Sequence, residues 1–215
     1  GIIIFACPEL VMLVHHIRAY LTHLRKAGNW HDVHSPFVYA LVENVLRKRG
    51  LEKEFADIEG LRAELLRNHD LIHVTDLGAG SHRTNEHERK VSDIARIALK
   101  PRRQAQQLFR LARYFKPLEI LELGTSLGIS TLYLSRAAVD ARVNTIEGDP
   151  ATAAIAQELF NRVHAGNIYS AVGSFNGQLP KLLHDIERLD MVFIDGHHTK
   201  TATLDNFGLC LAKAH

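Results

Sequence analysis

Two glycines and a carboxylate lie in the segment of this chain that is its best candidate for a ligand-binding site. An apolar run, Ile120–Leu123, ends in a turn that contains Gly124 and Gly128 and opens a helix with an apolar face. Glycine lets the backbone come close to a bound ligand, and this order of strand, turn and helix is typical of nucleotide-like cofactor sites. Glu122 lies in the same segment, where a carboxylate would repel a pyrophosphate but attract an amino group. The sequence therefore predicts a site for a cationic nucleoside.

A second carboxylate lies where the ribose of such a ligand is expected. Glu147 ends another apolar run and follows Gly128 by about 20 residues, the interval at which an acid on the neighbouring strand binds ribose hydroxyl groups. Two further apolar runs end in glycine or polar residues, at 173–175 and 195–198. Because parallel sheets bind ligands outside the carboxyl ends of their strands, we expect all four ends to meet at one rim.

The elements that must position these residues follow from hydrophobic periodicity. Apolar runs that suit buried parallel strands lie at 120–123, 142–146, 168–172 and 191–194. Helical periodicity predicts helices at 129–137, 150–163, 179–187 and within 199–215. Earlier helices are expected at 14–24, from Ser35-Pro36 onward, and at 52–66, 91–98 and 105–115. This order predicts an α/β fold with a helical region over 1–117 and a parallel sheet domain over 118–215.

Composition and charge narrow the classes of partner. Of the 215 residues, 46% are hydrophobic and 23% charged, and the net charge of +2 gives no basis for a nucleic-acid partner. No apolar run is long enough to span a membrane. Two cysteines, far apart in the sequence, predict a reducing, cytoplasmic setting without disulfides. Residues 1–11 are apolar without the basic flank of a signal peptide, and are either native or the remnant of a tag or misassigned start.

Three motifs, ILELGTSLG, TIEGD and DMVFIDGHH, make residues 118–198 resemble class I S-adenosylmethionine-dependent methyltransferases, and the last motif resembles that of small-molecule O-methyltransferases. Together with HSPFVY, DLGAGS and RKVSDIA, they make residues 15–209 resemble a poorly characterised bacterial branch of that family. The resemblance implies a Rossmann-like sheet of strand order 3-2-1-4 and S-adenosylmethionine as the cofactor. It also implies methyl transfer to a small-molecule acceptor, with oxygen favoured.

The resemblance assigns roles to individual residues. The loop at the methionine end of the cofactor would comprise Glu122, Gly124, Thr125, Ser126 and Gly128. The ribose would be bound at Glu147 and Gly148, and the adenine at Gly173, Ser174 and Phe175. Asp195 would lie at the rim beside the transferring methyl group.

Several residues keep more than one interpretation. An aspartate at the position of Asp195 binds Mg²⁺ in metal-dependent relatives, but it could instead orient substrate or cofactor, or cap a helix. His197 is either a general base for an acceptor hydroxyl or a turn residue. The polar segment that begins at Asp76-Leu-Gly-Ala-Gly-Ser81 is expected to form a mobile lid or a structural loop. His31 and His34 are expected to lie in a polar turn rather than to bind a metal.

Two other function classes stay open beside the enzyme. One is a non-catalytic S-adenosylmethionine-binding or partner subunit. The other is a nicotinamide-dependent oxidoreductase, although its G-x-G-x-x-G pattern is absent. Sheets of this family continue beyond the fourth strand, so the run at 191–194 is expected to be an exposed apolar edge. We therefore expect either a chain that lacks its C-terminal strands or a homodimer that covers this edge.

Overall fold

The computed structural model describes residues 16–23, 25, 35–48, 50, 52–75, 88–196 and 199–214. Contacts divide the chain into two units, Gly1–Arg47 and Lys48–His215. The predicted division at 117/118 stays a prediction, although the helices that precede residue 117 and follow Lys48 lie in the same unit as the sheet.

The first unit contains short helices. Residues 16–23 are helical, and Pro36–Leu41 forms α2, which is followed by the π-helix η2 at Val42–Leu46. The predicted start of α2 is confirmed: Ser35 is its N-cap, with an Oγ that accepts a hydrogen bond from the Val38 N–H at 3.4 Å, and proline takes the first position. Ser-Pro is an effective start because proline has no N–H to leave unpaired there.

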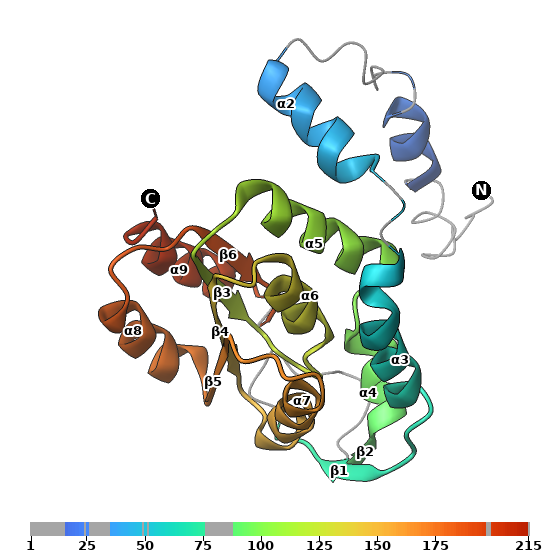
Figure 1. Ribbon diagram of the computed structural model, residues 1–215, viewed down its shortest axis with the longest axis vertical. Helices are drawn as coiled ribbons and strands as arrows, with labels where there is room; N and C mark the ends of the chain where they lie inside the picture. The colour runs from blue at the N-terminus through green and yellow to red at the C-terminus, as the bar shows by residue number, and fades with distance from the viewer. Residues whose placement is uncertain are drawn as a thin grey trace, which may run out of the picture. The chain divides into compact units, whose positions relative to one another are not determined.

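A parallel sheet forms the centre of the second unit (Figure 1). Its strands are β3 (Glu119–Leu123), β4 (Arg142–Glu147), β5 (Ile168–Val172) and β6 (Met191–Ile194). They lie in the order β5-β4-β3-β6, which confirms the predicted order 3-2-1-4 when these four strands are counted along the chain. Leu123 pairs with both Ile146 and Ile194, so β4, β3 and β6 are in register near their carboxyl ends.

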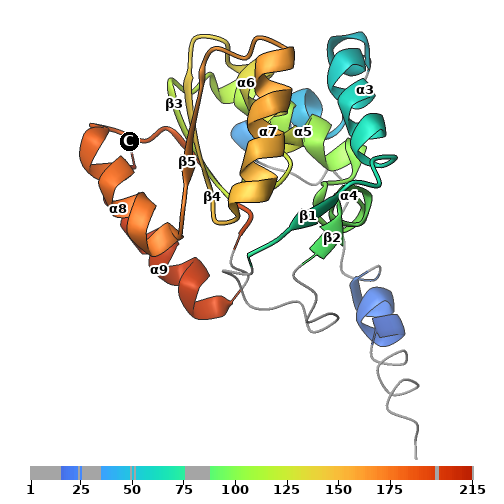
Figure 2. The same cartoon turned by 90° about the horizontal axis from the view of Figure 1, so that it is seen from below.

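Helices cover both faces of this sheet (Figure 2). On one face lie α8 (Phe175–Asp185) and α9 (Lys200–Leu211), which bury Leu121 and Leu123. On the other lie α5 (Arg102–Phe115), α6 (Ile129–Ala137) and α7 (Pro150–Arg162). The 3-10 helix η3 (Glu52–Phe55), α3 (Ala56–Leu65) and α4 (Val91–Ala98) form an outer layer. Phe55, Phe109 and Phe160 belong to the core cluster that joins this outer layer to α5–α7.

The structure differs from the sequence-based expectations in three elements. Leu71–His73 (β1) and Glu88–Lys90 (β2) form an antiparallel pair within the region expected to be helical. The helix α8 begins at Phe175 rather than at 179, because Ser174 caps it and Pro180 is accommodated inside it. The helix expected over 52–66 is divided into a 3-10 segment and α3.

The strand β6 lies at one edge of the sheet. Within the described residues β3 is its sheet neighbour on one side and no strand lies on the other. All four of its residues are half-buried, and α9 packs beside it. The predicted edge position is thus confirmed.

Among the described residues, no helix combines the length and apolar character needed to cross a membrane.

Gly128 provides a test of this packing. Its φ is +79°, and a Cβ there would lie 2.6 Å from Cε1 of Phe160. We expect Gly128→Ala to lower the free energy of unfolding by about 1–3 kcal/mol, measured by urea denaturation. Gly60→Ala is the control, since nothing lies within 4 Å of its Cβ position in α3. That change should raise stability by up to about 1 kcal/mol, and equal effects at the two glycines would contradict the structure.

Candidate functional site

The ends of the parallel strands are tied together at one rim. The Gly124 N–H donates to the Ile146 carbonyl at 2.9 Å, and the Asp195 N–H donates to the Leu123 carbonyl at 2.8 Å. Gly124 has a φ of +102°, and a Cβ there would lie 2.8 Å from the carbonyl oxygen of Asp195. Only glycine therefore allows the end of β6 to lie against the turn that follows β3.

Glu122 lies beneath this turn and is completely buried. Its carboxylate accepts hydrogen bonds from three hydroxyl groups: Ser130 at 2.6 Å and Thr131 at 2.5 Å, both in the first turn of α6, and Thr145 of β4 at 2.8 Å. Burial raises the pKa of Glu122 to about 7. The three hydroxyl donors act in the opposite direction, while the negative charge of Asp195 raises the pKa further.

The hydrogen bonds of Glu122 give this residue a structural role, whereas the sequence predicts a contact with the cofactor. Both carboxylate oxygens are occupied by hydroxyl groups, so the side chain holds β3, β4 and α6 together. Ser130 is half-buried and donates to Glu122 from the beginning of α6. Direct contact between Glu122 and a cationic ligand stays a prediction.

Glu147 contacts the same turn from the end of β4. Its Oε2 accepts a hydrogen bond from the Ser126 N–H at 2.6 Å, and its Oε1 accepts one from the Asp149 N–H at 2.9 Å. Gly148 lies between Glu147 and Asp149. The Thr125 and Thr145 hydroxyl oxygens are 2.6 Å apart, which connects the turn to the Glu122 cluster. The two predicted carboxylates therefore bracket one turn, Glu122 from below and Glu147 from the neighbouring strand.

The three residues predicted for the adenine have packing roles in the structure. A Cβ at Gly173 would lie 2.8 Å from Nε2 of Gln178. The Ser174 Oγ caps α8 by accepting from the Gly177 N–H at 3.3 Å. The Phe175 ring lies against Gly196, whose Cβ position is 2.6 Å from Cζ of Phe175. The structure thus brings Phe175 to the end of β6, and adenine binding there stays a prediction.

Two contacts at the rim are not predicted by the sequence. Lys100, in the linker between α4 and α5, places its Nζ 2.5 Å from Oδ1 of Asp195. Asp149 caps α7 through the Thr152 N–H at 2.7 Å, and its other oxygen accepts from the Thr75 N–H at 2.6 Å. The second contact places Thr75, two residues after β1, against Asp149, whose own N–H donates to Glu147. Neither partner could be identified from spacing, because each comes from a distant segment.

The remaining predicted residues lie outside the described part of the chain. These are His197, the segment that begins at Asp76, and the pair His31 and His34. One oxygen of Asp195, the residue considered for Mg²⁺, is paired with the ammonium group of Lys100. No group of three or more His, Cys, Asp or Glu side chains within the described ranges could hold a metal ion.

Comparison with known proteins agrees with this geometry. Residues 121–215 match a family described as a methyltransferase domain. A catechol O-methyltransferase from Niastella koreensis is 36% identical over 95 residues, which are 43% of this chain and 43% of the relative. A transmembrane O-methyltransferase from Homo sapiens is 35% identical over 96 residues, 42% of this chain and 33% of the relative. The matched segment thus spans less than half the length of these relatives.

Solved structures share the fold. The O-methyltransferase TomG from Streptomyces achromogenes, in complex with SAM, has 30% identity and a TM-score of 0.51, covering 55% of this chain and 53% of its own. An O-methyltransferase from Bacillus cereus in complex with SAH has 21% identity and a TM-score of 0.53. The similarity covers 83% of this chain and 68% of that one. An SAH-bound methyltransferase from Podospora anserina has 18% identity and a TM-score of 0.54. Here the similarity covers 99% of this chain and 68% of the other. The predicted resemblance to methyltransferases is thus confirmed for residues 121–215, and the solved structures confirm the predicted fold.

The buried Glu122 makes stability depend on pH. In the folded protein its carboxyl keeps a proton up to about pH 7, whereas in the unfolded chain it loses the proton near 4.5. Because the folded state binds more protons between these values, the free energy of unfolding should fall by about 3 kcal/mol as pH rises through this window. In Glu122→Gln this decline should be absent, as measured by urea denaturation from pH 4 to 8.

Glu158→Gln is the matched control, since Glu158 is exposed on α7. Its pH profile should follow that of the wild type. A decline of full size in Glu122→Gln would show that another group titrates.

Proposed function

We propose that this chain binds S-adenosylmethionine and that the protein to which it belongs transfers the methyl group to the oxygen of a small-molecule acceptor. The observation that carries the proposal is the turn at 124–128, which lies between two carboxylates and against the end of β6. The match of residues 121–215 to a methyltransferase domain supports it.

The residues present suit such a ligand. Gly124 leaves no side chain between the turn and Asp195, and Glu147 is half-buried at the rim, where a carboxylate can accept hydrogen bonds from ribose hydroxyl groups. In the proposal, Glu147 and Gly148 hold the ribose. The adenine lies beside the segment from Gly173 to Phe175.

Methyl transfer from a sulfonium needs little acid–base catalysis by the protein. When bound, S-adenosylmethionine supplies a methyl carbon that forms a bond to the acceptor oxygen while the carbon–sulfur bond breaks and its electron pair stays on sulfur. Proximity and orientation then supply most of the rate, so the main task of the chain is to hold the ligand in place. Glu122 keeps the turn in position from below, and Asp195 orients the reacting groups. His197 is the proposed acceptor of the hydroxyl proton.

The test is the affinity for S-adenosylhomocysteine, measured by calorimetry with NAD⁺ in parallel. We expect the wild type to bind S-adenosylhomocysteine and not NAD⁺. Glu147→Gln should bind about tenfold or more weakly, because it loses a charged acceptor for the ribose and for the Ser126 N–H. Glu158→Gln should leave the affinity unchanged.

Binding of NAD⁺ without S-adenosylhomocysteine would contradict the proposal and favour an oxidoreductase. Binding of S-adenosylhomocysteine without methyl release over a panel of hydroxylated metabolites would instead favour the non-catalytic alternative.

We also propose that a second copy of the chain covers the outer edge of β6, since an unpaired apolar strand edge favours association. Light scattering should then give a dimer, and Val192→Lys should shift it toward monomer. A wild type that is monomeric at all concentrations would contradict the proposed dimer.

The cytoplasmic location that the cysteine content predicts stays a prediction.

A further inference from the structure

An ammonium group lies beside Asp195, the residue whose counterpart binds Mg²⁺ in metal-dependent relatives. Lys100 Nζ is 2.5 Å from Oδ1 of Asp195, the first residue after β6. The Lys100 side chain is 33% exposed and that of Asp195 is 16% exposed. The pair is therefore partly shielded from water, where an ion pair is stronger than on an open surface.

The position of Lys100 is set by a polar network that reaches back to α3. Arg62 Nη1 donates to the Lys100 carbonyl at 2.8 Å, and Arg62 itself is buried. Its Nε donates to Oε1 of Glu59 at 3.1 Å, and the same oxygen accepts from the Tyr133 hydroxyl at 2.6 Å. The linker before α5 is thus held by a network that includes two helices, α3 and α6. Lys100 reaches Asp195 from a fixed backbone rather than from a free surface.

Asp195 also acts on the buried carboxylate below it. Its negative charge raises the pKa of Glu122, although burial is the larger cause. Two carboxylates close to one ligand site favour a cation beside them. The chain supplies that cation through Lys100.

We propose that Lys100 is the cation of the methyl-transfer rim, where it neutralises Asp195 and binds the ionised oxygen of the acceptor. The inference rests on the proposed function and adds the acceptor class: a phenol or enol whose oxygen loses its proton readily. An ammonium group has three N–H donors, so the bond to Asp195 leaves others for the acceptor oxygen. A positive charge beside a hydroxyl lowers its pKa, which favours the nucleophilic form at neutral pH.

Methyl transfer would then need no divalent metal. The acceptor oxygen forms its bond to the methyl carbon, the carbon–sulfur bond breaks with its electron pair staying on sulfur, and the acceptor proton leaves to solvent or to a base. Lys100 keeps its own proton throughout. The N–H donors that Asp195 leaves unused belong to a charged group, and hydrogen bonds from such a group are stronger to an oxygen that carries negative charge.

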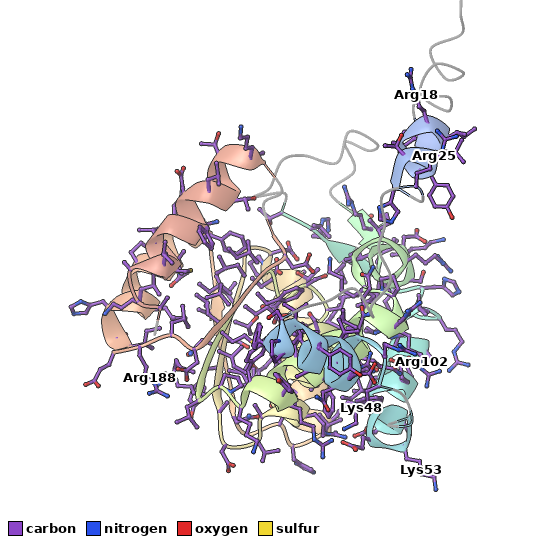
Figure 3. The ribbon with its side chains drawn as sticks, turned by 90° about the horizontal axis from the view of Figure 1, so that it is seen from above. Arg18, Arg25, Lys48, Lys53, Arg102 and Arg188 are labelled. Atoms are coloured by element: carbon purple, nitrogen blue, oxygen red, sulfur yellow. The ribbon has the colours of Figure 1, made fainter. Side chains whose placement is uncertain are left out.

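The test uses 4-nitrophenol, whose ionisation is followed by its absorbance, added to the full chain saturated with S-adenosylhomocysteine. We expect the pKa of the bound phenol to fall by about one unit in the wild type and in Lys100→Arg, and to return to the value of the free phenol in Lys100→Met. Lys53→Met is the matched control, because Lys53 is exposed and points away from the sheet (Figure 3). It should behave as the wild type.

The outcomes separate this inference from the proposed function. Calorimetry should give S-adenosylhomocysteine affinities within about threefold in wild type and Lys100→Met, which also shows that the variant is folded. Should the wild type fail to bind S-adenosylhomocysteine, the proposed function fails. If the wild type binds S-adenosylhomocysteine, three results would each overturn the role of Lys100. They are a bound phenol whose pKa is unshifted, no phenol binding at millimolar concentration, and a pKa shift that is retained in Lys100→Met. So would a phenol shift that appears only with added Mg²⁺.

Discussion

A carboxylate without access to water lies under the turn on which the candidate site depends. Burying Glu122 disfavours its charged form, and three hydroxyl donors offset part of that cost, so its pKa is held at about 7. Because the donors come from β4 and α6, the carboxylate fixes the strand and the helix that flank the turn. Glu147 then holds the turn at its tip. A ligand that binds there meets a backbone that is already ordered, and binding does not have to order it.

The sheet could be predicted closely because each of its strands is a short apolar run between amphipathic helices. The strand Met191–Ile194 has the predicted bounds, and β3 and β4 differ from theirs by one residue. The antiparallel pair β1–β2 could not be predicted, since each strand has three residues and their pattern is largely exposed. Periodicity does not predict the early start of α8, because glycine and proline inside a segment disfavour a helix, whereas the capping Ser174 favours one.

The site could be predicted in part for a related reason. Glu122, Glu147 and Asp195 lie at strand ends, and parallel topology brings strand ends together. Lys100 reaches the rim from the linker between α4 and α5, and its carbonyl is bound by Arg62 of α3, so no spacing in the sequence marks either residue. The hydroxyl partners of Glu122 did leave a signal: Ser130 and Thr131 are adjacent polar residues at the start of an otherwise apolar helix. A buried acid needs donors, and that requirement could have pointed to them.

A crystal structure of the chain with S-adenosylhomocysteine tests the central claim most directly. We predict that the ribose hydroxyl groups lie within hydrogen-bond distance of the Glu147 carboxylate, while the homocysteine end lies against the turn at 124–128 beside Asp195. A nucleoside bound at another surface, or a Glu147 carboxylate that turns away from the ribose, would contradict the account.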